Sequence, residues 1–238
     1  MIKEIKSKQN EQIKRVVKLN DSKFRKEVKE FKVDGFHMFE MAKEAGLLKE
    51  IYVLKEIKGA DVPQFIVSEE IMAKISSNKS PQGIVSVCKL LEEKEIKNRK
   101  VLYLDDVSDP GNLGTILRTA LAFDYSDVIL SKNCCSIYNE KTLQASQGSI
   151  FKLNIVSDKK LADFKAKGYK ILATEIKGSQ PLDGIRNLDK FILVLGNEAH
   201  GVSNDVLKLA DCRVRIDIRN IESLNVAIAG AIAMYSLK

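Results

Sequence analysis

Hydrophobic residues in the first third of the chain follow both helical and strand-like spacing. Residues 7–19 place apolar side chains at helical intervals, and helices are also expected over 37–45 and directly after Ser68. Apolar runs typical of short strands occur over 51–54, 65–67 and 84–87. This mixture predicts a small α/β unit.

A charged stretch with few turn residues follows this unit. Residues 90–100, with the sequence LLEEKEIKNRK, are typical of a linker or of a short connecting helix. We therefore predict a domain boundary near residue 92, with one domain over 1–92 and a second over 93–238.

The second part alternates strands and helices. Buried-type strands are predicted over 101–107, 127–131, 151–156, 170–176, 191–195 and 213–218. Helices are predicted over 113–123, 139–146, 158–167 and 223–237. The alternation predicts an α/β fold with a mostly parallel sheet covered on both faces, and in such sheets ligands bind beyond the carboxyl ends of the strands.

Composition narrows the class of protein. The chain has 238 residues, of which 45% are hydrophobic and 30% charged, a globular balance that argues against a disordered chain. No apolar run reaches the roughly 18 residues that span a bilayer, and the first residues lack an apolar signal core, so we expect a cytoplasmic protein without a membrane partner. The four cysteines lack C-x-x-C spacing and there are only two histidines, so neither a disulfide framework nor a metal site is expected.

The net charge is +7, and residues 1–32 carry eleven Lys and Arg against five Asp and Glu. One interpretation is a solvated helix face. The other is an electrostatic footprint for an RNA backbone, with Lys23, Arg25 and Lys26 as the candidate contacts.

Two segments carry unusual residues after predicted strands. In DPGNLGTILRTA, residues 109–120, Asn112 can cap a helix that begins at Leu113, and Arg118 lies within that helix. This is neither a dinucleotide fingerprint nor a phosphate-binding P-loop, so a structural role and a functional one both stay open. In LVLGNEAHGVS, residues 193–203, Glu198 follows a buried strand, where an unpaired carboxylate is costly.

A third segment, residues 216–235, begins the final helix at Glu222-Ser223. Asn225 is its one strongly polar side chain among Ala, Ile, Val and Met. A buried asparagine needs hydrogen-bond partners, so it either joins loops together or faces a ligand.

Together, Asn112-x-Gly-x-x-x-Arg118, Gly196-x-Glu198-x-x-Gly201 and Ser223-Leu224-Asn225 resemble, in order, three motifs of the SpoU/TrmH family of RNA ribose 2′-O-methyltransferases, in the SPOUT superfamily. The segments 144–152 and 80–83 resemble further parts of the same family, so the resemblance covers essentially the whole chain. A departure at 34–37, Asp-Gly-Phe-His where many relatives have Glu-Gly, affects the expected target and not the expected chemistry.

The resemblance implies a trefoil-knotted methyltransferase domain that binds S-adenosylmethionine without a metal, preceded by a small RNA-binding domain. The residues implied in cofactor binding are Thr174, Leu195, Gly196, Asn197, Gly201, Ile216, Ile218, Ser223 and Leu224, with 174–178 as a further wall. The residues implied in catalysis are Arg118, Asn112, Glu198, Asn225 and Ser223. Arg118 is expected to orient the ribose hydroxyl and contact RNA, and a homodimer is implied.

The expected reaction is methyl transfer to a ribose 2′-hydroxyl of structured RNA, with 23S ribosomal RNA favoured over transfer RNA. Two alternatives remain at this point: a non-catalytic RNA-binding or ribosome-assembly protein, and a transfer-RNA or base methyltransferase of the same superfamily. The intact Arg118, Glu198 and Asn225 favour an active enzyme.

Overall fold

The computed structural model describes residues 1–185 and 188–237, and the chain divides into two compact units, 1–91 and 92–238. Residue 238, the end of the predicted second domain, lies outside the described residues. The elements of the first unit are β1 (Ile2–Ile5), α1 (Glu11–Lys18), α2 (Ser22–Val28), β2 (Glu30–Asp34), α3 (Phe36–Glu44), β3 (Leu48–Val53), β4 (Gln64–Val67), α4 (Glu69–Ile75) and β5 (Ile84–Lys89).

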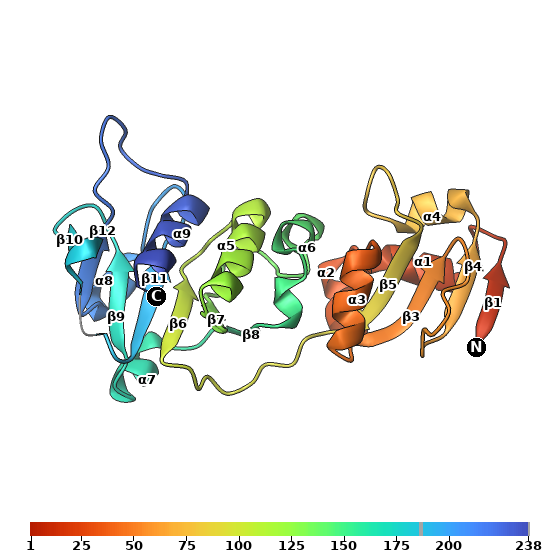
Figure 1. Cartoon of the computed structure of the whole chain (residues 1–238), viewed down its shortest axis with the longest axis horizontal. Coiled ribbons are helices and arrows are strands. Elements are labelled where there is room, and N and C mark those ends of the chain that lie inside the picture. Colours follow the sequence, from red (N-terminus) through yellow and green to blue (C-terminus); the bar gives the residue numbers. More distant parts are fainter. Residues whose placement is uncertain (186–187, 238) are drawn as a thin grey trace. The chain divides into compact units, whose positions relative to one another are not determined.

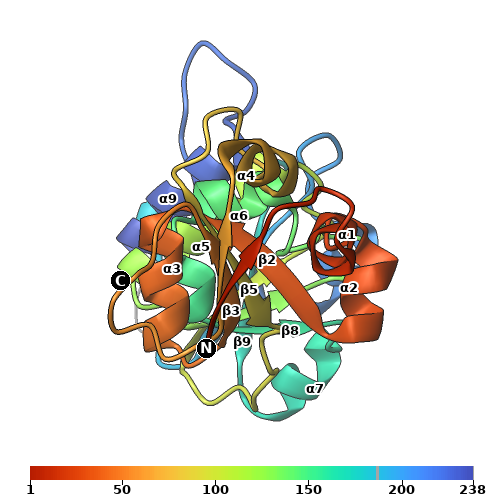
Figure 2. The same ribbon diagram turned by 90° about the vertical axis from the view of Figure 1, so that its right-hand side faces the viewer.

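The first unit is a five-stranded mixed sheet between helices, with strand order β1-β4-β3-β5-β2. Ile13 and Val16 of α1 and Ile71 of α4 pack on one face, and Phe39 of α3 packs on the other. Figure 2 shows the sheet between α3 on one side and α1 and α2 on the other. The α/β prediction is confirmed, but β1 and β2 were not predicted, because their strand conformations depend on pairing with β4 and β5.

The second unit contains β6 (Lys100–Leu104), α5 (Pro110–Ala122), β7 (Asp127–Leu130), α6 (Glu140–Ser146), η1 (Ser149–Phe151), β8 (Asn154–Ser157), α7 (Leu161–Ala166), β9 (Lys170–Thr174), β10 (Gln180–Pro181), η2 (Leu182–Gly184), β11 (Phe191–Leu195), α8 (Asn204–Leu209), β12 (Cys212–Arg215) and α9 (Val226–Ser236). Its strand order is β10-β12-β9-β11-β6-β7-β8, and every strand pair is parallel. The predicted parallel sheet is confirmed.

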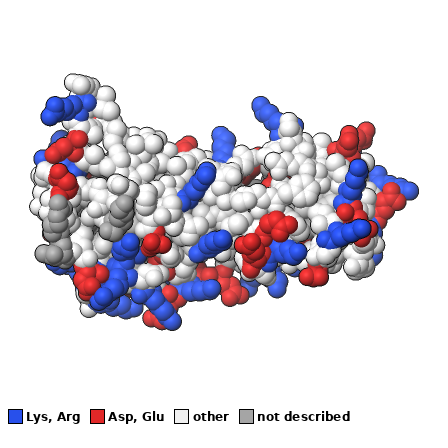
Figure 3. All heavy atoms as spheres, viewed as in Figure 1, with Lys and Arg blue, Asp and Glu red and all other residues white. Residues whose placement is uncertain are grey.

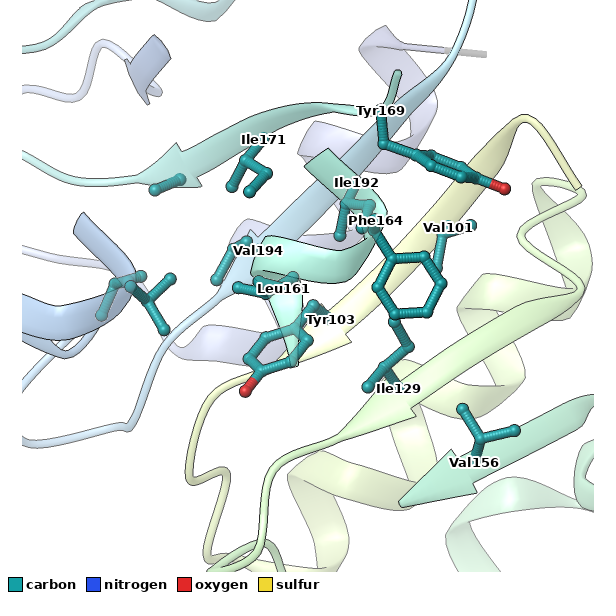
Figure 4. Close-up of a cluster of buried hydrophobic side chains, with 13 residues drawn as sticks. Val101, Tyr103, Ile129, Val156, Leu161, Phe164, Tyr169, Ile171, Ile192 and Val194 are labelled. Atoms are coloured by element: carbon teal, nitrogen blue, oxygen red, sulfur yellow. The ribbon is translucent and has the colours of Figure 1, made fainter. Parts of the chain in front are cut away.

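Helices cover both faces of this sheet. Phe164 of α7 and Val206 of α8 pack on one face against Val101, Ile129 and Ile192, and Figure 4 shows the labelled members of this cluster coming from β6, β7, β8, β9, β11 and α7. Helices α5, α6 and α9 lie together on the other face (Figure 1). Gly114 allows α5 to approach α6 closely, since a Cβ there would lie 2.6 Å from the Cβ of Ala145.

Several predicted boundaries were wrong for local reasons. Helix α5 begins at Pro110 and not at Leu113, because the Asp109 side chain accepts from the Asn112 N–H at 2.7 Å. Helix α9 begins at Val226 and not at Ser223, because Asn225 is its N-cap. The strand expected from residue 151 begins at Asn154 after the 3₁₀ turn η1.

Residues 90–99, where the sequence predicted a linker or a short helix, form no helix. Residues 97 and 98 pack against the second unit through Asp127. Asp127 is only 2% exposed, and its carboxylate accepts hydrogen bonds from the backbone N–H groups of Lys97 (3.1 Å) and Asn98 (2.9 Å). The side-chain amides of Asn98 (2.7 Å) and Asn154 (2.6 Å) also donate to it. These donors satisfy a carboxylate that burial would otherwise leave without water.

Candidate functional site

A cavity of about 360 Å³ lies at the carboxyl edge of the seven-stranded sheet. Its walls come from the segments that follow β9, β11 and β12 and from α9. The predicted cofactor residues that line it are Thr174, Gly196, Asn197, Gly201, Ile216, Ile218, Ser223 and Leu224. Its volume and its mixture of apolar walls and few polar groups are typical of a small-molecule site.

Leu195 is the one predicted cofactor residue that does not line the cavity. It ends β11, is 1% exposed, and packs against α9, where its Cδ1 lies 2.6 Å from the position that a Cβ on Gly230 would occupy. Leu195 therefore supports the helix behind the cavity wall.

Other lining residues were missed by the sequence analysis. They include Leu182, Arg215, Val226, Ala229 and Ala233, together with Val214, Ala199 and His200. Strand β12 lies beside β9, and α9 covers this end of the sheet, so these residues reach the cavity through tertiary packing. The predicted parallel topology could have indicated these residues, because it brings the carboxyl ends of neighbouring strands to one edge of the sheet.

The loop after β11 is closed on itself. Asn197 and Gly201 exchange backbone hydrogen bonds of 2.9 and 3.0 Å, and the Asn197 side chain accepts from the N–H groups of Ala199 and His200. A Cβ on Gly196 would overlap the backbone of Gly201, so only glycine permits this approach.

Two aspartates that follow β6, Asp105 and Asp106, also hold the loop after β11 in place. The Asp105 carboxylate accepts from the Ser203 N–H at 2.7 Å, and the Asp106 carbonyl accepts from the Asn197 side-chain amide at 2.8 Å. Asp106 has a φ of 59°, a left-handed conformation that costs energy in a residue other than glycine. Hydrogen bonds to its carboxylate from Ser131 and from the Asn133 side chain offset this cost.

Glu198 joins the loop to the start of α5. Its carboxylate accepts hydrogen bonds from the Ser108 N–H (3.2 Å) and hydroxyl (3.1 Å), the Asp109 N–H (3.1 Å) and the Asn112 side-chain amide (3.1 Å). Burial alone would raise the pKa of Glu198, but the donors from Asn112, Asp109 and Ser108 hold that pKa below its ordinary value.

Asn112 extends this arrangement to the final helix. Its side-chain oxygen accepts from the Asn225 side-chain amide at 2.9 Å, while the Asn225 oxygen accepts from the N–H groups of Ala227 and Ile228. The structure therefore brings Asn112, Glu198 and Asn225 into one hydrogen-bonded cluster. The sequence predicted that Asn112 caps α5, but Asp109 does so. The Asn112 side chain instead links Glu198, in the loop after β11, to Asn225, the N-cap of α9.

Arg118 stands apart from this cluster. It lies on the exposed surface of α5, two turns after Asn112, and it does not line the cavity. Over the described residues, its guanidinium takes part in no hydrogen bond or ion pair, so all five of its N–H groups are available to a ligand.

The basic N-terminal segment is not a uniform patch. Lys23 and Lys26 are exposed on α2, whereas Arg25 is 8% exposed and donates to the carbonyls of Leu19 (2.9 Å) and Asn20 (2.8 Å). Arg25 thus satisfies carbonyls at the end of α1, which corrects the expectation that it contacts RNA. In Figure 3, cationic and anionic groups are interspersed over the visible face.

Residues 1–185 and 188–237 contain neither a candidate membrane-spanning helix nor a candidate metal-binding cluster. No helix there has both the length and the apolar composition needed to cross a membrane. No group of three or more His, Cys, Asp and Glu side chains in that part of the chain could hold a metal ion.

Family models match both units. Residues 99–235 match the SpoU rRNA methylase family, and residues 10–86 match an MRM3-like substrate-binding domain. A Bacillus subtilis protein named 23S rRNA (guanosine(2553)-2′-O)-methyltransferase RlmP is 35% identical over 247 residues, which cover 100% of both chains.

Solved structures show the same fold. The AdoMet-bound rRNA methyltransferase from Sinorhizobium meliloti is 26% identical with a TM-score of 0.87, covering 99% of this chain and 97% of that one. The SpoU methyltransferase AviRb from Streptomyces viridochromogenes, solved with AdoMet, shares the fold with a TM-score of 0.87 at 22% identity, covering 96% of this chain and 97% of that one.

The lowered pKa of Glu198 predicts a pH-dependent contribution to stability. A carboxylate whose pKa is lower in the folded state stabilises that state fully above its unfolded pKa of about 4.3, and loses this contribution as the pH falls through the lowered value. Glu198→Gln should therefore lower the melting temperature by about 2 °C at pH 7, and the difference from wild type should shrink as the pH falls below about 4.3.

Thermal melts across this pH range test the prediction. Glu222→Gln is the matched control, because Glu222 is an exposed carboxylate in the neighbouring segment. A difference for Glu198→Gln that persists unchanged at pH 3 would contradict the stabilising role of the ionised carboxylate.

Proposed function

The chain belongs to the SpoU rRNA methylase family, and we propose that it methylates a ribose 2′-hydroxyl of 23S ribosomal RNA with S-adenosylmethionine as methyl donor. The observation that carries this proposal is the cluster of Asn112, Glu198 and Asn225, which adjoins the cavity while Arg118 stays exposed on the same helix as Asn112. The B. subtilis relative is named for guanosine 2553, so the corresponding guanosine is the proposed target.

The residues of the cavity fit S-adenosylmethionine. Ile216, Ile218 and Leu224 provide apolar walls suited to a purine, and the loop segments on either side of them provide backbone hydrogen-bonding groups. Glu175 and Glu198 add negative charge, which suits a cationic ligand. When bound, this cofactor would supply a methyl group on a sulfonium, from which a neutral thioether can leave without help from a metal.

Arg118 is the residue proposed to contact the ribose. Arginine is a poor general base because its pKa lies above about 12, so its role is to orient the hydroxyl and stabilise negative charge on the oxygen as the proton leaves. A neighbouring RNA phosphate is the proposed proton acceptor. Asn112, Glu198 and Asn225 are bonded to one another, and they position the start of α5 and the cavity loop.

The first unit is proposed to bind the RNA. It matches a substrate-binding domain, and Lys23 and Lys26 expose two positive charges on one short helix. This role requires the protein to meet ribosomal RNA, so we place it in the cytoplasm. The trefoil knot implied by the sequence resemblance also stays a prediction.

Helix α9 supports a homodimer. It is apolar around its whole circumference, and Ile228, Ile232 and Tyr235, at positions i, i+4 and i+7, are 52%, 37% and 55% exposed. Its other side packs on α5 and β11. A contiguous apolar stripe of this kind marks an interaction surface, and a second copy of the chain is the proposed occupant.

The proposed activity predicts a specific effect of Arg118 substitutions. Arg118→Ala should leave folding and S-adenosylmethionine affinity nearly unchanged while lowering single-turnover methyl transfer to a 23S ribosomal RNA transcript by about a hundredfold. Arg118→Lys should restore little, because an ammonium group lacks the planar fork of the guanidinium. Calorimetry and alkaline-hydrolysis mapping of 2′-O-methylation measure the two effects.

Ribosomal RNA from a strain lacking the gene should show loss of one 2′-O-methylguanosine, restored by the wild-type gene and not by Arg118→Ala. A ribosomal RNA with unchanged methylation in that strain would overturn the proposed target. A full rate for Arg118→Ala would overturn the proposed role of Arg118.

The RNA-binding proposal for α2 predicts a change in salt dependence. Since each neutralised phosphate releases counterions, Lys23→Gln with Lys26→Gln should reduce the slope of log affinity against log salt by about 2. Lys55→Gln with Lys58→Gln is the matched control, because these exposed lysines lie in a loop away from α2. Equal slopes for both double variants would contradict the proposal and would indicate that Lys23 and Lys26 belong to a solvated helix face that does not contact RNA.

The dimer proposal predicts dissociation by a charge on α9. Ile228→Asp should convert a dimer into a monomer in sedimentation equilibrium, because the carboxylate would be buried without a partner. Phe36→Asp, at a 51% exposed position in the first unit, should leave the dimer intact. A wild-type protein that sediments as a monomer would contradict the proposal.

A further inference from the structure

Two carboxylates of the described residues, those of Glu175 and Glu198, line the cavity, and their surroundings differ. The oxygens of Glu198 are occupied by the donors at the start of α5. Glu175, which directly follows β9, uses only Oε1, which accepts from the backbone N–H groups of Ile176 (2.8 Å) and Lys177 (3.2 Å). In the part of the chain that the structure describes, Oε2 of Glu175 receives no hydrogen bond.

The position of Glu175 is fixed by the sheet. Its backbone N–H donates to the Val214 carbonyl at 2.9 Å, which continues the pairing of β9 with β12 beyond Thr174. The two backbone donors to Oε1 then hold the side chain against its own loop. The negative charge is therefore held in the cavity wall before any ligand arrives.

The arginine among the described wall residues does not neutralise this charge. Arg215 also lines the cavity, but its Nε donates to the Asp217 carboxylate at 2.8 Å and its Nη1 donates to the Ser179 carbonyl. Arg215 and Asp217 thus form their own ion pair. Glu175 therefore lines the cavity without a cationic partner for its carboxylate in the described chain.

We propose that Glu175 is a specificity residue that makes the cavity prefer the sulfonium cofactor, S-adenosylmethionine, over its neutral thioether product, S-adenosylhomocysteine. This inference rests on the proposed function. The two ligands differ by one methyl group and one positive charge, so a fixed carboxylate acts on their difference and favours release of the product. For charges about 6 Å apart at an effective dielectric constant near 60, between the values for a protein surface and for bulk water, the preference is about fivefold.

Calorimetry of both ligands with the full chain, without RNA, tests this inference. Glu175→Gln keeps a carbonyl oxygen for the N–H groups of Ile176 and Lys177 and removes only the charge. It should weaken S-adenosylmethionine about fivefold and leave S-adenosylhomocysteine nearly unchanged. Sinefungin, which carries an ammonium group near the position of the sulfonium, should weaken like S-adenosylmethionine.

Two further variants keep the test decisive. Glu175→Asp retains the charge and should retain the preference, which covers the case in which the glutamine variant folds poorly. Glu222→Gln removes an exposed carboxylate that does not line the cavity and should change neither affinity.

Equal weakening of both ligands by Glu175→Gln would overturn the inference, because it would assign Glu175 to the shape of the cavity alone. Absence of binding of either ligand to the wild-type protein would instead contradict the proposed function. The two failures are therefore distinguishable.

Discussion

The hydrogen bonds to the Glu198 carboxylate set the geometry of the whole site. Their donors belong to the turn after β6 and the first turn of α5, whereas Glu198 itself follows β11. Because Asn112 also accepts from Asn225, the same group of bonds fixes the start of α9. A single ionised side chain thus holds together the helix that bears Arg118, the wall of the cavity and the final helix.

The sheet makes these bonds possible. Strands β6 and β11 are paired in parallel from Lys100–Phe191 to Leu104–Leu195, so the loops that follow them leave the sheet side by side. From β6 the chain moves outward to β7 and β8, then returns on the other side of β11 with β9 and β12. The site therefore lies where the direction of strand order reverses, the usual location of ligands in parallel α/β sheets.

The sequence predicts six strands of the seven-stranded sheet, all but β10, and most helices of the second unit, because its apolar runs are short, buried and regularly separated. It does not predict which capping residue is used when two compete. Asp109 and Asn112 both suit the start of α5, and Pro110, which favours the first helical position, decides for Asp109. Asn112 is then free to bind Glu198 and Asn225. Asn112 and Asn225 are 113 positions apart in the sequence, so no local pattern could have predicted their contact.

The contacts and burial of individual side chains were harder to predict than which loops surround the cavity. The motifs led to most of the residues that line the cavity, but Leu195 turns under α9 because alternation along β11 directs it to the helical layer. Arg25 has the same charge as its neighbours Lys23 and Lys26, and only the folded position of the end of α1 shows that its guanidinium is used internally. Glu175 lies in the segment 174–178 that the resemblance gave as a further wall, but nothing in the sequence singled out its carboxylate.

The docking of residues 97 and 98 on Asp127 decides where the methyltransferase unit can be separated from its neighbour. The family match begins at residue 99, but a fragment cut there would lack both backbone donors and the Asn98 amide that satisfy the buried Asp127 carboxylate. Among the residues that the structure describes, only Asn154 would remain to donate to it. A fragment that begins at residue 92 keeps all four donors, so the folding boundary lies several residues ahead of the family boundary.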